Sequence, residues 1–241
     1  MNLINNNSFF AFTCFLISTS INLLFIPFLI KLGKNYNFLD YPSERKNHAK
    51  ELVNIGGITI FLAIYFVFFI FYILYILNLF SDHDFIDLNI PGLFFINVII
   101  FATGFCDDKY KLSPFIRLII QISAASLIWS MGLRIDFLDY SFIFPNFDPV
   151  ELPKILSYLI TVIWVAGLTN AINWLDGMDG LAGGISLITA LGMMILGFYL
   201  DNSSAIIFTS SIVGSCLGFL FYNFYPSKII MGDAGSNFLG F

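Results

Sequence analysis

The sequence predicts an all-α fold, namely a polytopic transmembrane helical bundle. Of its 241 residues, 58% are hydrophobic and only 11% are charged. Soluble domains carry about 25% charged residues, so a globule of this composition could not cover its surface with polar groups. The charged residues are also confined to short segments between long apolar runs. These observations argue against a soluble enzyme, a disordered chain and a nucleic-acid-binding protein.

Seven apolar segments approach or reach the length of about 20 residues that a membrane-spanning helix needs. They are residues 8–30, 55–80, 90–106, 118–133, 155–175, 181–200 and 205–225. The third and fourth are short and cross a bilayer only by tilting or by including flanking residues. An eighth span is expected to begin just before Phe241, and residues 1–241 are interpreted as a single integral membrane domain.

The distribution of basic residues predicts the orientation in the membrane. All but two of the eleven Lys and Arg residues lie in the connections that follow odd-numbered spans. Because basic residues favour the cytoplasm, these connections are expected to be cytoplasmic and the N-terminus to lie outside. The first span is expected to be retained, because no basic residue precedes it and no small-residue cleavage site follows it.

Compact clusters of polar residues also follow the odd-numbered spans. The third span ends in a pair of acids, the fifth in a series of amides and acids at three-residue spacing, and an acid between glycines follows the seventh. These residues are Asp107 and Asp108, then Asn170, Asn173, Asp176 and Asp179, and finally Asp233. Neighbours three residues apart share a helix face. Solvated helix ends or helix packing would explain single clusters, so only the whole pattern indicates a functional site.

Carboxylates and amides are hard oxygen ligands. They suit Mg²⁺ or Mn²⁺ better than zinc, because no pair of histidines or cysteines accompanies them. Mg²⁺ takes one or two protein carboxylates and completes its shell with substrate phosphates. Acids, a divalent cation and nearby basic residues can therefore hold a diphosphate. At a membrane edge, one substrate would be a soluble nucleotide and the other a membrane lipid.

With its motifs in this order, the chain resembles the polyprenyl-phosphate N-acetylhexosamine-1-phosphate transferases, which form glycosyltransferase family 4. Four stretches carry the resemblance: Asp40-x-Pro42-x-x-Arg45-Lys46-x-His48 with Gly56-Gly57, Asp107-Asp108, residues 170–183, and Met231-Gly-Asp233-Ala-Gly-Ser. The Arg45-Lys46-x-His48 form is more similar to the undecaprenyl-phosphate N-acetylglucosamine-1-phosphate branch than to the pentapeptide branch.

The resemblance implies a reaction and a set of site residues. N-acetylhexosamine 1-phosphate, most simply N-acetylglucosamine 1-phosphate, would pass from a UDP-N-acetylhexosamine to polyprenyl (undecaprenyl) phosphate, with release of UMP and with Mg²⁺ or Mn²⁺ as cofactor. The site would face the cytoplasm at a bacterial inner membrane, and a homodimer is left open. The implied catalytic residues are Asp107, Asp108, Asp176 and Asp179; the implied substrate-binding residues are Asn173, Arg117, Lys46, His48, Asn170 and Gly177; the implied metal contacts are Asp233 and Asn173.

One departure from the family concerns the end of the chain. Family members continue with further spans and a His-containing loop, whereas the histidines here are His48 and His83. The chain is therefore interpreted as C-terminally truncated. Three alternatives stay open: a phospho-N-acetylmuramoyl-pentapeptide transferase, an inactive truncated homologue and an ion-coupled transporter. A UbiA-like or CDP-alcohol transferase would carry regular Asp-x-x-x-Asp signatures, which the sequence lacks.

Overall fold

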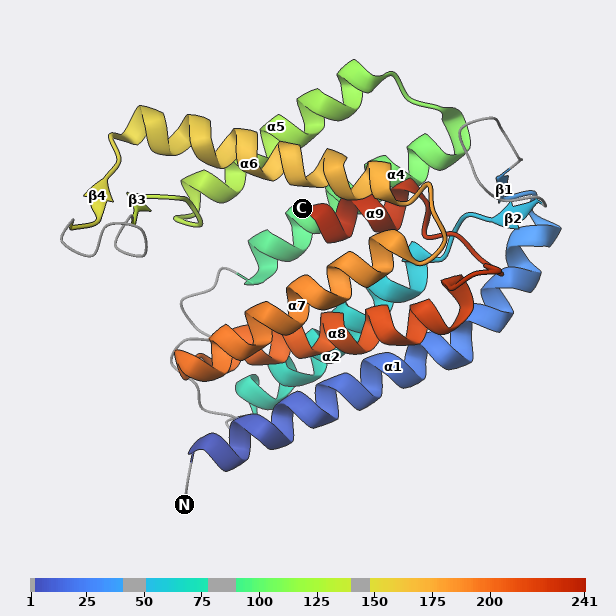
Figure 1. Cartoon of the computed structure of the whole chain (residues 1–241), viewed down its shortest axis with the longest axis horizontal. Coiled ribbons are helices and arrows are strands. Elements are labelled where there is room, and N and C mark those ends of the chain that lie inside the picture. The colour runs from blue at the N-terminus through green and yellow to red at the C-terminus, as the bar shows by residue number, and fades with distance from the viewer. Residues whose placement is uncertain (1–2, 41–50, 78–89, 140–147) are drawn as a thin grey trace.

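The computed structural model describes residues 3–40, 51–77, 90–139 and 148–241. Most of these residues form helices that run back and forth between two ends of a bundle (Figure 1). The helices are α1 (Leu3–Asn35), α2 (Gly57–Ile76), α4 (Ile90–Tyr110), α5 (Pro114–Ser130), α6 (Lys154–Leu175), α7 (Leu181–Tyr199), α8 (Ser203–Asn223) and α9 (Gly232–Gly240). Strands β1 (Leu39–Asp40) and β2 (Leu52–Val53) pair antiparallel, as do β3 (Phe137–Leu138) and β4 (Val150–Glu151).

The helices confirm the predicted membrane bundle. Within the described ranges, six helices are long and apolar enough to cross a membrane. The predicted fourth span is helix α5, which has 17 residues and begins at Pro114, earlier than expected. At 1.5 Å per residue it is about 26 Å long, slightly short of a hydrocarbon core of about 30 Å. The chain is therefore a multi-pass membrane protein, and α5 is shorter than the six helices that are long enough to cross a membrane.

The surface of the bundle is apolar, as expected for a protein surrounded by lipid. Large apolar side chains such as Phe25, Ile163 and Ile188 are exposed. Helix α8 is the most buried of the spans and packs against α1, α2 and α7. Gly218 on α8 lies so close to the backbone of Thr19 on α1 that a side chain would not fit between them. Helix α8 therefore forms the centre of the packing between α1, α2 and α7.

The connections after odd-numbered spans meet at one end of the bundle. In Figure 1 the ends of α1, α4, α6 and α8 lie there together, next to the β1–β2 pair, and the β3–β4 pair lies at the opposite end. This arrangement agrees with the prediction that the polar clusters share one face of the membrane.

The predicted start of an eighth span is the nine-residue helix α9. It packs against α4, α6 and α2. Two glycines make this approach close, because a Cβ atom on Gly104 of α4 or Gly57 of α2 would collide with the α9 backbone. Helix α9 is thus inserted among the spans, and its first turn reaches the end of the bundle where the polar clusters gather.

Candidate active site

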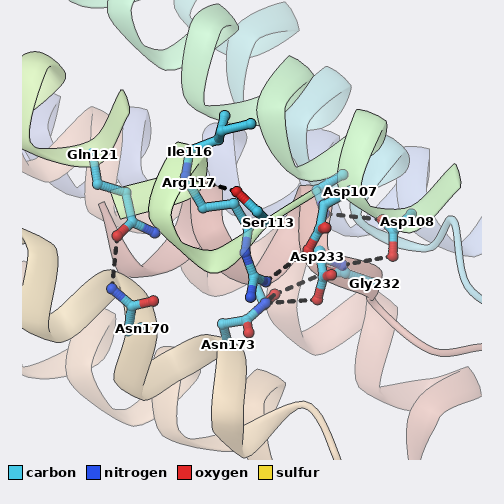
Figure 2. A network of polar contacts seen from close by, with 12 residues as sticks. Asp107, Asp108, Ser113, Ile116, Arg117, Gln121, Asn170, Asn173, Gly232 and Asp233 are labelled. Carbon is cyan, nitrogen blue, oxygen red and sulfur yellow. Dashed lines mark hydrogen bonds and ion pairs between the residues drawn. The ribbon is translucent and has the colours of Figure 1, made fainter. Parts of the chain in front are cut away.

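The first pair of site residues joins α4 to α5. Ser113 caps α5, since its Oγ accepts a hydrogen bond from the backbone N–H of Ile116 at 3.3 Å, and Pro114 occupies the first turn. This turn brings Arg117 back toward α4, where its Nη1 lies 2.6 Å from Oδ2 of Asp107 (Figure 2). Asp107 is only 4% exposed. A buried carboxylate needs such a partner, so the local turn explains how Asp107 is tolerated.

Asp108 holds the N-terminus of α9. Its Oδ1 accepts a hydrogen bond from the backbone N–H of Asp233 at 3.0 Å, and its Oδ2 accepts one from Ala234 at 3.1 Å. The first backbone N–H groups of a helix lack partners within that helix, and a negative charge there is favourable. Asp108 therefore caps α9 from a different helix, which gives it a structural role that its sequence motif did not reveal.

Asn173 and Asp233 form the centre of the site. Asn173 Nδ2 donates to Oδ1 of Asp233 at 2.7 Å and to Oγ of Ser236 at 3.0 Å. The carboxyl groups of Asp233 and Asp107 also face one another. Two carboxylates in this position repel each other unless a proton or a cation lies between them.

Asp176 follows the last residue of α6 and adds a further carboxyl group. Its Oδ2 accepts a hydrogen bond from the backbone N–H of Gly232 at 2.9 Å. Burial raises the pKa of Asp176 well above its usual value, and the charges of Asp108 and Asp233 raise it further. The side chains of Asp107, Asp108, Asp176 and Asp233, contributed by separate helix ends, are called the acidic cluster below.

The series at three-residue spacing does not converge as a whole. Asn173 and Asp176 reach α9, but Asp179 Oδ2 accepts a hydrogen bond from the backbone N–H of Ser227 at 3.1 Å. Asn170 donates to Oε1 of Gln121 on α5 at 2.7 Å. Helix α6 ends at Leu175, so Asp176 and Asp179 lie in the turn beyond it. Within the helix, the step of three residues from Asn170 to Asn173 falls about 60° short of a full turn. The catalytic role of Asp179 and the substrate-binding role of Asn170 stay predictions.

The remaining predicted residues are Lys46, His48 and Gly177. Lys46 and His48 lie outside the described residues. A side chain at Gly177 would meet only the carbonyl oxygen of Trp174, at 3.6 Å. The left-handed backbone conformation that favours glycine is found instead at Gly180, with φ of 73°. The turn after α6 thus depends on Gly180 more than on Gly177.

Replacing Asp108 with asparagine should destabilise the protein. One of the two acceptor oxygens becomes a donor facing a backbone N–H, and the favourable charge at the start of α9 is lost. We expect a loss of about 1–2 kcal/mol in the free energy of unfolding. Thermal unfolding in detergent measures it, with the exposed Glu151→Gln at the opposite end as the control. An equal change in both variants would contradict the capping role of Asp108.

Comparison with known proteins places this site in a family. Glycosyl transferase family 4 matches residues 90–241. The chain belongs to this family. The match begins at α4 and includes every member of the acidic cluster together with Arg117 and Asn173. It confirms the family that the motifs predicted.

Several curated proteins are similar to most of this chain. A probable undecaprenyl-phosphate N-acetylglucosaminyl 1-phosphate transferase of Bacillus subtilis is 34% identical, over 94% of this chain and 59% of the relative. A decaprenyl-phosphate N-acetylglucosaminephosphotransferase of Mycobacterium leprae is 32% identical, over 87% and 53%. A phospho-N-acetylmuramoyl-pentapeptide-transferase of Listeria innocua is 30% identical, over 90% and 67%. The chain thus spans about half to two thirds of the length of these relatives.

The carboxylates of the acidic cluster are of the ligand type that could hold a divalent cation. Within the described ranges, no group of three or more His, Cys, Asp or Glu side chains is arranged so that it could hold a metal ion without other ligands. Mg²⁺ does not need one, because it usually takes one or two carboxylates and fills its shell with phosphate and water oxygens. The facing carboxyl groups of Asp107 and Asp233 supply that number. Asn173 directs its amide nitrogen at Asp233, so ligation through its oxygen requires the amide to turn.

Several polar residues that take part in hydrogen bonds at the site were not predicted from the sequence. Gln121 binds Asn170, and Asn54 Nδ2 lies 3.4 Å from Oδ1 of Asp108. Asn223 accepts a hydrogen bond from the backbone N–H of Gly180 at 3.0 Å and donates to the carbonyl of Ile229 at 2.8 Å. An unpaired amide is costly within an apolar span. A lone amide in such a span, as at Gln121, therefore predicts a polar partner on a neighbouring helix.

Proposed function

We propose that this chain transfers N-acetylhexosamine 1-phosphate, most simply N-acetylglucosamine 1-phosphate, from a UDP-sugar to polyprenyl phosphate. A phosphate oxygen of the lipid attacks the sugar-bearing phosphorus, the bond from that phosphorus to the oxygen bridging to UMP breaks, and UMP leaves. The product is a lipid diphosphate that carries the sugar. The proposal draws on the activities for which the relatives are named and on the chemistry of the acidic cluster.

Convergence of groups from three helices is the observation that carries this proposal. Asp107 of α4, Asn173 of α6 and Asp233 of α9 meet at one end of the bundle, with Arg117 beside them (Figure 2). The reacting phosphates bring several negative charges together, so catalysis depends on charge neutralisation and positioning. A bound Mg²⁺ or Mn²⁺ would neutralise negative charge on the phosphates.

The residues of the site have distinct tasks in this proposal. The side chain of Arg117 is 26% exposed while that of its partner Asp107 is 5% exposed, so the guanidinium lies at the open side of the ion pair and can also contact a phosphate. Asp107 orients the lipid phosphate, which is already largely ionised at neutral pH. Asp233 and Asp107 would hold the cation. Asp108 and Asp176 fix the first turn of α9, and therefore fix Asp233.

Membrane vesicles that contain the full chain test the proposal. With undecaprenyl phosphate, sugar-labelled UDP-N-acetylglucosamine and Mg²⁺, they should form a labelled lipid and UMP. The pentapeptide-transferase relative covers 90% of this chain, so UDP-N-acetylmuramoyl-pentapeptide is the second donor to compare. Absence of product with both donors and with UDP-N-acetylgalactosamine would rule the proposal out.

The proposed orientation places the acidic cluster at the cytoplasmic face of a bacterial inner membrane, with the N-terminus outside. Cysteines introduced at the exposed residues Lys34 and Glu151, at opposite ends of the bundle, test it in a Cys106→Ser background. A membrane-impermeant maleimide should label Lys34→Cys only from the cytoplasmic side and Glu151→Cys only from outside. The reverse pattern would invert the proposed topology.

A further inference from the structure

A pair of amides joins two membrane-spanning helices next to the acidic cluster. Gln121 of α5 is 3% exposed, and its Oε1 accepts a hydrogen bond from Nδ2 of Asn170 on α6 at 2.7 Å (Figure 2). Asn170 Nδ2 also donates to the carbonyl of Ala166, within its own helix, at 2.7 Å. Both hydrogens of this amide nitrogen are therefore committed within the protein.

The amide pair lies about one helical turn from two residues of the site. Gln121 follows Arg117 by four positions on α5, and Asn170 precedes Asn173 by three positions on α6, so each amide shares a helix face with its neighbour. Figure 2 shows the Gln121–Asn170 contact alongside Arg117 and Asn173. A shift of α5 against α6 at this level would therefore move Arg117 relative to Asn173.

The other polar contacts of Arg117 and Asn173 do not fix the position of α5 relative to α6. Arg117 binds Asp107 on α4, and Asn173 binds Asp233 on α9, so neither contact joins α5 to α6. Two further side-chain hydrogen bonds within the described residues connect these helices, Ser126 with Tyr158 and Trp129 with Ser157. Both come later along α5 and earlier along α6, toward the opposite end of the bundle. Near the site, the amide pair is the side-chain hydrogen bond that joins α5 to α6 within the described residues.

We infer that Gln121 and Asn170 are positioning residues, whose amide–amide hydrogen bond aligns α5 with α6 and so holds Arg117 and Asn173 at the spacing that phosphosugar transfer needs. The inference rests on the proposed function. It assigns Asn170 a task different from the substrate binding that the sequence predicted. A hydrogen bond of this kind suits the membrane interior, where an unpaired amide is costly and neighbouring helices supply the partner.

Exchanging the two side chains tests the inference. Glutamine is one methylene longer than asparagine, so Gln121→Asn or Asn170→Gln alone changes the combined length of the pair, whereas the double variant restores it. We expect each single variant to lower kcat about tenfold, with the KM for the UDP-sugar within about twofold, because a displacement near 1 Å in an active site is costly. The kcat of the double variant should recover to within about threefold of the parent value.

Asn97→Gln is the matched control. Asn97 is an amide on span α4 whose Nδ2 donates to the carbonyl of Leu93 in its own helix at 3.0 Å. The same change in length there should leave kcat unchanged. If Asn170 contacted substrate directly, its variant would raise KM and the double variant would stay impaired, which would overturn the inference.

A second measurement does not depend on activity. Spin labels attached to cysteines that replace Phe115 of α5 and Trp174 of α6, both exposed, report the separation of the two helices. The Cys106→Ser background removes the free cysteine that is not buried. The distance distribution should broaden in each single variant and narrow again in the double variant; unchanged distributions in the single variants would refute the alignment role. A parent chain without transferase activity would count against the proposed function, while the spin-label distances would still decide this inference.

Discussion

Asp233→Asn is expected to lower kcat by about 10²–10³-fold, the range found when one electrostatic group is removed from an active site. The Asp233 carboxyl faces Asp107 and accepts a hydrogen bond from Asn173. An amide keeps the size of the side chain but loses its charge. Asp108 contacts the backbone of residue 233 and not its side chain, so α9 should stay in place. The measurement is the transfer rate in vesicles as a function of Mg²⁺ concentration.

A matched substitution far from the site controls this experiment. Asp148 is an exposed acid at the end of the bundle where β3 and β4 pair. Asp148→Asn should leave the rate unchanged. If the Asp233→Asn variant kept its rate within about threefold of the parent at every Mg²⁺ concentration, the assignment of Asp233 to the cation would be wrong.

Gly104→Ala is expected to disrupt both stability and activity. A Cβ atom at this position of α4 would collide with the carbonyl group of Asp233 and would lie 2.6 Å from Cα of Ala234. The contacts are to backbone atoms, so they cannot be relieved by a side-chain rotation. We expect a loss of about 1–3 kcal/mol in the free energy of unfolding. Displacement of Asp233 should also remove most of the transfer activity of the protein that still folds.

Gly167→Ala is the matched control for this prediction. Gly167 also lies within a membrane-spanning helix, α6, but a Cβ atom there would have no neighbour within 4 Å. Alanine has the higher helix propensity by about 1 kcal/mol, so the variant should be at least as stable as the parent. Thermal unfolding and transfer assays on both variants provide the comparison. Equal behaviour of the two would contradict the close packing of α4 on α9.

The spans and the location of the site were predictable from the sequence. Apolar length and the placement of Lys and Arg follow from the energetics of a bilayer, which acts on each segment locally. Helix ends that carry acids must then gather at a membrane face. The sequence therefore predicted that Asp107, Asp176 and Asp233 lie at one end of the bundle, as the structure has them.

The internal arrangement of the site was not predictable in the same way. Helix α9 has nine residues and owes its position to close approaches at Gly57 and Gly104. These contacts join segments far apart in the sequence, so they cannot be predicted from a local sequence pattern. Asp108 likewise gave no sign that its oxygens would cap α9, because the backbone N–H groups that it accepts belong to residues 233 and 234.

The position of the phosphorus atom that reaches the lipid tests the central claim most directly. Vesicles with the full chain receive undecaprenyl phosphate, Mg²⁺ and UDP-N-acetylglucosamine labelled with ³²P in the phosphate attached to the sugar. If the acidic cluster exchanges a phosphosugar between a nucleotide and a lipid phosphate, the radioactivity moves into the lipid and the released UMP is unlabelled. Radioactivity that remains in a water-soluble nucleotide diphosphate while the sugar moves, or a lipid that never gains label, would contradict it.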